Sequence, residues 1–220
     1  MQFAIDGLLL VDFVAANIIT NITIPTQSDA VLVMSVFGWI IIHQHLGYIF
    51  NWSLPWADYK AGFGSVNADF WLGLERVHLL TSSKPYRLRV EVQQKNSNLW
   101  FSAEYWSFQI GDELNDKYRL EVSGYSGDAG DGLMYDGDWA GDGNFGDYYH
   151  NGMKFTTYDH DNDEWLGGNC GPYNDGSWWY NRCQWACLMC NSFGFYWNPL
   201  QPPPSWNGKL LSSRMMIKLQ

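Results

Sequence analysis

The sequence has no apolar run long enough to cross a membrane. Its most apolar segment, Val31–Ile42, covers about 12 residues, whereas a membrane-spanning helix needs about 20. We interpret this segment as a buried strand. The first 20 residues also make a poor signal peptide, because no Lys or Arg precedes their apolar part and Asp6 and Asp12 interrupt it. The sequence therefore gives no export signal of its own.

Basic residues are scarce. Lys and Arg total 13 against 23 Asp and Glu, which gives a formal net charge of −10. Nucleic acid is excluded as the expected partner, because phosphate contacts need clustered Lys and Arg. Charged residues make up only 16% of the chain and aromatic residues 17%, which excludes a coiled coil and a disordered acidic tail. Four cysteines do not by themselves make a disulfide scaffold.

The acidic residues that are present concentrate in one part of the chain. Residues 112–175 hold fifteen of the 23 acidic residues and three basic ones, so the remainder of the chain is slightly basic. This segment is rich in glycine and still carries aromatic residues, a composition that indicates ordered loops facing a hard cation. Its Asp136–Asp138 and Asp142–Asn144 pairs could hold a second cation, but a hydrated insertion loop is the favoured interpretation.

The pattern of apolar residues predicts a mixed α+β domain. It indicates helices at 56–61 and 68–80 and antiparallel strands at 86–93, 99–110 and 118–125. Ser53 is the expected N-cap of the first helix, and Gly62 is its expected end. The first of the three strands alternates strictly between apolar and polar residues. After Gly124 this patterning stops, and residues 124–208 are expected to form loops that serve a function.

Several motifs follow one another in a characteristic order. They are Trp-Ala-Asp-Tyr-Lys-Ala-Gly-Phe-Gly (56–64), Phe-Trp-Leu-Gly-Leu-Glu (70–75), Tyr-Arg-Leu (118–120), Gly-Tyr-Ser-Gly-Asp-Ala-Gly-Asp (124–131), His-Asn-Gly-Met-Lys-Phe (150–155), Asp-His-Asp-Asn-Asp (159–163), Gly-Gly-Asn-Cys (167–170) and Trp-Trp-Tyr-Asn-Arg-Cys (178–183). Over about residues 38–217 the chain resembles the fibrinogen C-terminal domain family, which includes ficolins, tachylectins, angiopoietins and tenascins.

This resemblance implies an α+β fold with a central antiparallel sheet, short helices and a loop-rich calcium-binding and ligand-binding subdomain at about 124–208. Residues 1–37 lack the Cys pair with which the family usually opens. We therefore treat them as an atypical or degraded N-terminal segment.

Three alternating carboxylates are the candidate metal site. Asp159, Asp161 and Asp163 precede two glycines, and Ca²⁺ takes six to eight oxygens from carboxylates, carbonyls and water. Taken alone, the pattern also suits a solvated acidic turn. The resemblance favours Ca²⁺, bound by the side chains of Asp161 and Asp163 and by the carbonyls of Trp165 and Gly167, with Asp159 as a supporting carboxylate.

The four cysteines fall into two pairs. The resemblance implies a disulfide between Cys170 and Cys183, which would tie the calcium loop to the segment that follows it. Cys187 and Cys190 have no counterpart in the family. A zinc site would need two further ligands at suitable spacing, so free buried thiols or an additional bridge remain as the alternatives for this pair.

Lectin-like members of the family bind acetyl groups beside the calcium site. The resemblance places this pocket at a cis peptide bond between Arg182 and Cys183 and at the backbone amides around Cys183 and Gln184. Gln184 replaces the family's usual His. The expected pocket tyrosine falls on Asn174, and Tyr173 lies one position earlier.

A second pocket tyrosine has no clear counterpart, because the family's Tyr-Ala-Asp-Gly segment is replaced by residues around 198–205. Tyr196 lies nearby in the sequence. The chain has 13 tryptophans, of which Trp178, Trp185 and Trp197 could stack on a sugar. The favoured interpretation for each of these three is core packing.

No catalytic signature accompanies these motifs. The sequence has no H-E-x-x-H, nucleophile elbow or Gly-rich phosphate loop, and His43-Gln-His45 resembles a metal pair only superficially. We therefore expect a domain that is not an enzyme.

The first functional hypothesis is a calcium-stabilised, secreted, extracellular recognition domain that binds acetylated carbohydrate, as lectins of innate immunity do. The alternatives are a module that binds a cell-surface receptor or matrix protein, and a degenerate copy without a ligand. No collagen-like or coiled-coil stretch is present, so any oligomer would form through regions absent from this chain.

Overall fold

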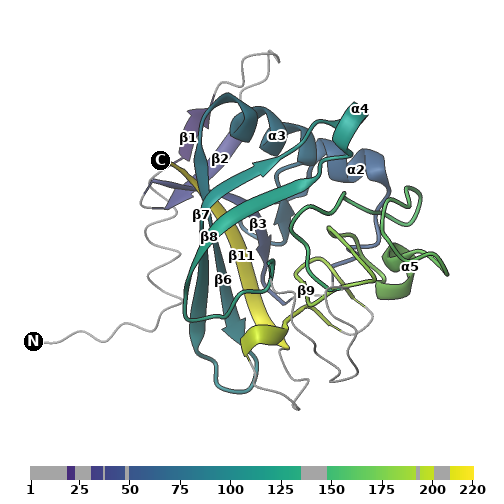
Figure 1. Cartoon of the computed structure of the whole chain (residues 1–220). Helices are drawn as coiled ribbons and strands as arrows, with labels where there is room; N and C mark the ends of the chain where they lie inside the picture. Colours follow the sequence, from purple (N-terminus) through teal and green to yellow (C-terminus); the bar gives the residue numbers. More distant parts are fainter. Residues whose placement is uncertain are drawn as a thin grey trace, which may run out of the picture.

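A large antiparallel sheet is the framework of the domain (Figure 1). The computed structural model describes residues 19–22, 31–36, 38–47, 50–134, 148–191, 194–200 and 209–220. Along the sheet the order of strands is β1 (Ile19–Ile22), β2 (Val31–Val36), β3 (Trp39–His45), β11 (Leu210–Leu219), β6 (Tyr86–Gln94), β7 (Trp100–Ile110) and β8 (Leu120–Gly127). The short strands β4 (Phe63–Gly64) and β5 (Phe70–Trp71) continue from β3.

The three predicted strands are confirmed as β6, β7 and β8, which pair as consecutive antiparallel neighbours. The segment Val31–Ile42, expected to be one strand, is instead divided between β2 and β3. Gly38 lies in the turn between them with a φ of 79°, a backbone conformation that glycine adopts without steric cost. The prediction of a single strand was therefore wrong, because one glycine reverses the chain.

The two faces of the sheet differ in burial. On β6 the alternation is as predicted, since Tyr86, Leu88, Val90 and Val92 are buried while Arg87, Arg89 and Glu91 lie on the opposite face. The buried face carries the helices and the loop-built part of the chain. It holds one continuous apolar core, which runs from the sheet into residues 178–197.

Three helices cover one end of the sheet (Figure 1): α2 (Trp56–Ala61), α3 (Leu74–Ser83) and α4 (Glu113–Asp116). Glu113 joins α4 to α2, because its carboxylate accepts hydrogen bonds from Trp56 Nε1 and Lys60 Nζ. The first helix ends at Gly62 as predicted, but its N-cap is Pro55 rather than Ser53.

The second predicted helix begins later than expected. Residues 70–71 form strand β5, and the helix starts only at Leu74, after Gly73 with a φ of 107°. A Cβ at position 73 would lie 2.8 Å from the backbone of Ala61. The chain therefore turns sharply at Gly73 to pass close to the end of α2, and this tertiary constraint overrides the apolar spacing that suggested a helix from 68.

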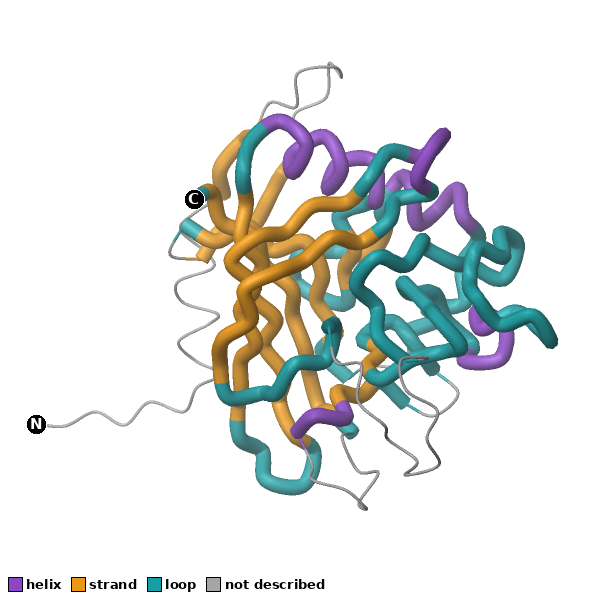
Figure 2. The backbone as a smooth tube through the Cα atoms, in the orientation of Figure 1, coloured by secondary structure: helices purple, strands orange, loops and turns teal. Residues whose placement is uncertain are grey.

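Between β8 and β11 the described residues form mostly loops, as predicted for 124–208 (Figure 2). The regular elements there are short: α5 (Cys170–Asn174), β9 (Ala186–Cys187), β10 (Tyr196–Trp197) and the 3₁₀ turn η1 (Asn198–Leu200). Large aromatic side chains replace secondary structure as the packing element here, and Phe155, Trp178, Trp179, Tyr180 and Trp197 are all fully buried. The pairs at 136–138 and 142–144 and the segment 201–205 lie outside the described residues.

No helix in the described part of the chain is long and apolar enough to span a membrane.

We expect Leu88→Ala to lower the free energy of unfolding by about 2–5 kcal/mol, because Leu88 is fully buried where the sheet meets the core. Glu121→Ala, on the exposed face of β8, should change it by less than about 0.5 kcal/mol. Urea denaturation of the two variants measures the difference. Equal effects would show that the core does not lie against this face of β6.

Candidate metal and ligand site

A single carboxylate closes the candidate calcium loop. Asp163 Oδ1 accepts a hydrogen bond from the backbone N–H of Trp165 at 2.9 Å, and Oδ2 accepts one from the N–H of Cys170 at 2.8 Å. The same loop is fastened to the next segment by the N–H of Glu164, which donates to the carbonyl of Asn181 at 3.0 Å. Asp163 therefore fixes the backbone of residues 163–170 from inside the loop.

The charge on Asp163 is costly without a cation. Burial and, to a smaller extent, the neighbouring carboxylate of Asp161 raise the pKa of Asp163 to about 6, although the hydrogen bonds from Cys170 and Trp165 oppose the rise. Asp161 itself is exposed. Two carboxylates in interaction range, one of them half-buried, are a donor set that fits Ca²⁺ and is destabilised in its absence.

Backbone oxygens would have to complete such a site. In the described part of the chain no group of three or more His, Cys, Asp or Glu side chains gathers as metal ligands would. The carbonyl of Trp165 accepts the N–H of Gly168 at 3.2 Å, and Gly167 is exposed. The Trp165 ring covers the two glycines, and a Cβ at position 168 would lie 2.9 Å from it. Glycine is therefore required for the loop to fold under this ring.

Asp159 is hydrogen-bonded to the start of α2. Its Oδ1 accepts hydrogen bonds from the backbone N–H of Trp56 at 2.9 Å and from the Thr157 hydroxyl at 2.7 Å. Burial would raise the pKa of Asp159, but these hydrogen bonds outweigh it and hold the pKa below its ordinary value. Asp159 thus satisfies an otherwise unpaired N–H at the start of α2 and anchors the acidic loop to that helix.

Two disulfides fix the loop subdomain. Cys170 and Cys183 are bonded, as the family resemblance implied, and the peptide bond between Arg182 and Cys183 is cis. Cys187 and Cys190 also form a disulfide, so of the alternatives for this pair the additional bridge is correct. The first bond joins α5 to the segment around residue 183, directly beside the acidic loop.

The expected ligand residues form a hydrogen-bonded chain. Gln184 Nε2 donates both to Asn174 Oδ1 and to the Tyr196 hydroxyl, and Asn174 Nδ2 donates to the carbonyl of Cys170 at 2.7 Å. Asn174 is buried, and burial raises the pKa of Tyr196. Tyr196, which the sequence left unassigned, is therefore the tyrosine that stands beside Gln184. Gln184 Oε1 is buried and has no partner among the described residues.

Tyr173 and the acidic loop share an exposed rim. The rings of Tyr173 and Trp165 meet edge to face, with 5.4 Å between their centroids, and Tyr173 is 57% exposed. The neighbouring Leu166 is 98% exposed. Arg182 is also exposed. We name Trp165, Leu166 and Tyr173 the loop rim. It presents apolar side chains to solvent next to Asp161 and Asp163.

The tryptophans proposed for sugar stacking lie in the core. Trp178 and Trp197 are fully buried and Trp185 is 8% exposed. Trp197 donates from Nε1 to the carbonyl of Gly130 at 3.1 Å. The core-packing interpretation of these three residues is therefore correct.

A buried histidine that sequence reasoning missed holds the subdomain together. His150 contacts the carbonyl of Trp179 through Nδ1 at 2.7 Å, and its Nε2 lies 3.3 Å and 3.2 Å from the backbone nitrogens of Trp185 and Ala186. These partners require a neutral ring with the proton on Nδ1. His150 opens one of the family motifs, but nothing in the spacing showed that it bonds to the backbone of residues 179–186.

His43 and His45 pack in the core. Both are buried against Trp52, with ring centroids 5.3 Å and 5.1 Å away, and His45 stacks on Phe195. Burial and the neighbouring His45 lower the pKa of His43 well below its ordinary value. The pair lies beneath the segment around Leu188.

These features define a class of protein: a fibrinogen-like globe domain. The fold matches the fibrinogen-like globe domain of human ANGPTL2 with a TM-score of 0.77 and 29% sequence identity, covering 96% of each chain. It also matches a lamprey fibrin D-dimer complexed with the peptide ligand Gly-His-Arg-Pro-amide, with a TM-score of 0.76 and 29% identity, covering 86% of this chain and 65% of that one.

The family model for the C-terminal globular domain of fibrinogen beta and gamma chains matches residues 32–202, and this chain belongs to that family. It is 39% identical to human fibroleukin over 162 residues, which cover 73% of this chain and 33% of fibroleukin. It is 40% identical to bovine angiopoietin-related protein 7 over 146 residues, covering 66% and 38%. The chain thus spans about a third of the length of these curated relatives.

Domains of this family are binding and structural domains without enzymatic activity, and this chain is likewise not an enzyme.

The buried His150 predicts a pH-dependent stability. Its pKa is lowered to about 4 by burial, against 6.5 when the chain is unfolded, so the unfolded state binds the proton more readily between these values. The contribution of His150 to the free energy of unfolding should be complete above pH 6.5 and about 3 kcal/mol smaller at pH 4.

Urea unfolding at pH 4–7 measures this slope, which His150→Gln should reduce and His160→Gln, at an exposed position, should leave intact. If the His150→Gln slope equals that of the unaltered protein, His150 does not supply the effect.

Proposed function

We propose that this domain is a calcium-stabilised extracellular recognition domain that binds a protein partner through the loop rim. One observation carries the choice of partner. The Gln184 amide nitrogen, at the position implied for an acetyl pocket, already donates to Asn174 and Tyr196, whereas Leu166 and Tyr173 of the loop rim are exposed. Exposed apolar and aromatic side chains with a polar border are typical of protein-binding surfaces.

The role of calcium rests on the acidic loop. Asp161 and Asp163 repel each other, and this repulsion contributes to the raised pKa of Asp163. The same Asp163 carboxylate accepts hydrogen bonds from two backbone N–H groups. Ca²⁺ would relieve this repulsion and keep both carboxylates ionised, while the carbonyls of Trp165 and Gly167 and water would complete its coordination. The cation would also order the loop rim, since Trp165 would belong both to the calcium site and to the rim.

An extracellular location agrees with the chemistry of the chain. Both cysteine pairs are oxidised, and disulfides persist in secreted proteins far better than in the cytosol. The fibrinogen, fibroleukin and angiopoietin-related relatives are secreted proteins, which supports the same location.

Calcium at 100 times its dissociation constant should stabilise the domain by about 2.7 kcal/mol, or about 5–10 °C in melting temperature for a domain of this size. Asp161→Asn should remove this shift, because Asp161 is exposed and supplies charge without holding the backbone. Differential scanning calorimetry with calcium and with EDTA measures it.

Glu121→Gln, an exposed carboxylate on β8, is the matched control and should keep the full shift. A melting temperature that EDTA leaves unchanged would contradict the calcium proposal.

Acetylated glycan, the basis of a role in innate immunity, is the second candidate. It is favoured by Gln184 Oε1, which is buried and has no partner among the described residues and would accept an acetamido N–H. This candidate predicts retention on N-acetylglucosamine beads in calcium and release by free acetate.

The two candidates are separated by binding the purified domain to an array of receptor and matrix ectodomains and to N-acetylglucosamine beads in parallel. The protein proposal predicts that Leu166→Ala with Tyr173→Ala weakens ectodomain binding by at least about tenfold. Leu114→Ala, an equally exposed leucine on α4, should have no effect. Binding to the beads alone would overturn the protein proposal in favour of the glycan.

A further inference from the structure

The face of the sheet opposite the core carries a row of aromatic and cationic side chains. Trp39 on β3, Lys218 on β11, Arg87 on β6 and Trp106 on β7 lie on four neighbouring strands, and we name them the cation–aromatic row. The Arg87 guanidinium lies 5.2 Å from the centroid of the Trp39 ring and 6.0 Å from that of Trp106, and Lys218 Nζ lies 5.8 Å from Trp39. The row therefore alternates indole rings with positive charge.

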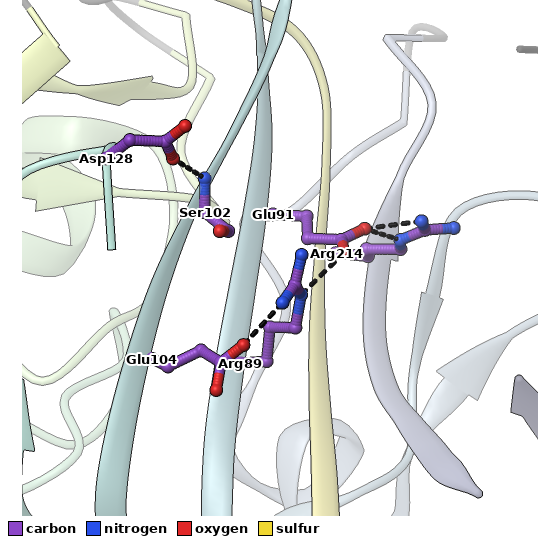
Figure 3. A network of polar contacts seen from close by, with 6 residues as sticks. All are labelled: Arg89, Glu91, Ser102, Glu104, Asp128 and Arg214. Atoms are coloured by element: carbon purple, nitrogen blue, oxygen red, sulfur yellow. Dashed lines mark hydrogen bonds and ion pairs between the residues drawn. The ribbon is translucent and has the colours of Figure 1, made fainter. Parts of the chain in front are cut away.

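Arg87 differs from the other arginines on this face. Arg89 pairs with Glu91 and Glu104, and Arg214 pairs with Glu91, so their charges are balanced within one network (Figure 3). No carboxylate of the described residues pairs with Arg87, whose Nε is buried without a hydrogen-bond partner. The charge of Arg87 is therefore not balanced by a described carboxylate as those of Arg89 and Arg214 are, and its guanidinium could pair with an anion.

The register places the two cations side by side. Lys218 and Arg87 are direct partners across the β11–β6 ladder, on the face of the sheet that Trp39 and Trp106 share. An anion placed over the row would interact with both cations at once.

One aromatic member of the row is exposed and the other is half-buried. Trp106 is 62% exposed, whereas Trp39 is partly covered; Trp100, outside the row, has its ring 5.5 Å from the Arg214 guanidinium and is 44% exposed. The adjacent strand passes close to Trp106, because a Cβ at position 124 would lie 2.8 Å from the Trp106 Cβ and glycine occupies that position. Exposed indoles offer flat apolar surfaces.

We propose that the cation–aromatic row binds an acidic polysaccharide, with sugar rings stacked on the indoles of Trp39 and Trp106 and a sulfate or carboxylate group on Arg87 and Lys218. The chain as a whole carries a net charge of −10, but most of its acidic residues lie in residues 112–175. The positive charge that would attract the polysaccharide is therefore confined to the cation–aromatic row. Two cations beside carboxylates are fewer than the clusters of four to eight that bind anionic membranes. A polyanion without sugar rings could not stack on the indoles.

The test is the affinity of the whole chain for a heparin-derived hexasaccharide, measured by isothermal titration calorimetry in 0.15 M salt, with calcium and separately with EDTA. We expect binding that is the same in both, since the row lies on the face of the sheet opposite the loop subdomain. Loss of calcium binding would therefore leave this site intact, so the two proposals fail independently. Absence of hexasaccharide binding would overturn the proposal.

Arg87→Gln and Trp106→Ala should each weaken hexasaccharide binding by at least about tenfold. Lys95→Gln, which removes an exposed cation at the far end of β6, is the matched control and should change it by less than about twofold. Trp106→Phe, which keeps an aromatic face, should retain part of the affinity. Melting temperatures of the variants check that each is folded.

Equal affinities for all variants would show that the polysaccharide binds elsewhere and would overturn the proposal. Polyglutamate and phosphatidylserine vesicles are the probes for an acidic protein and for a lipid surface. Binding of either as tightly as the hexasaccharide would show that charge alone is recognised, and would also overturn it. Uncharged dextran should not bind.

Discussion

The loop-built half of this domain depends on Asp163, a half-buried carboxylate that holds its backbone from within. Both oxygens of Asp163 accept main-chain N–H groups, and the Cys170–Cys183 disulfide closes the same region. The two hydrogen bonds are strongest while Asp163 is charged, and burial and Asp161 make that charge costly, since they raise its pKa to about 6. The proposed calcium ion would offset this cost, which is why the calcium proposal and the order of the loop rim are one physical question.

Around this carboxylate, buried aromatic side chains and hydrogen bonds from single polar side chains stabilise the loops, where most domains rely on helices and strands. Phe155 and Trp179 fill the core, His150 bonds to the backbone of residues 179–186, and Asp159 fastens the acidic loop to α2. Aromatic side chains supply burial without regular backbone, which accounts for the unusual tryptophan content. Among the described residues, the exposed aromatic side chains other than Tyr158 lie on the loop rim or on the face of the sheet opposite the core. The two proposed binding surfaces therefore lie on opposite sides of the core.

The sequence predicted the elements that are determined by their own residues. The alternation in β6 and the Gly62 end of α2 were both correct, and the family motifs gave the Cys170–Cys183 bond. The start of α3 could not be predicted, because Gly73 is required by the close approach of Ala61 rather than by its own neighbours. For the site, the acidic residues and Gln184 were found by their motifs, but the hydrogen bonds from Gln184 to Asn174 and Tyr196 and the role of His150 arise from contacts between distant segments.

The central claim is that calcium neutralises the Asp161–Asp163 pair, and the most direct measurement is the proton released when calcium binds. Because the pKa of Asp163 is about 6, calcium added at pH 6 should displace about half a proton per chain, and almost none at pH 7.5. Calorimetric titration in two buffers of different ionisation enthalpy gives this number together with the stoichiometry. One calcium per chain with proton release at pH 6 is the predicted result. Calcium that does not bind, or that binds with no proton release at pH 6, would contradict the account.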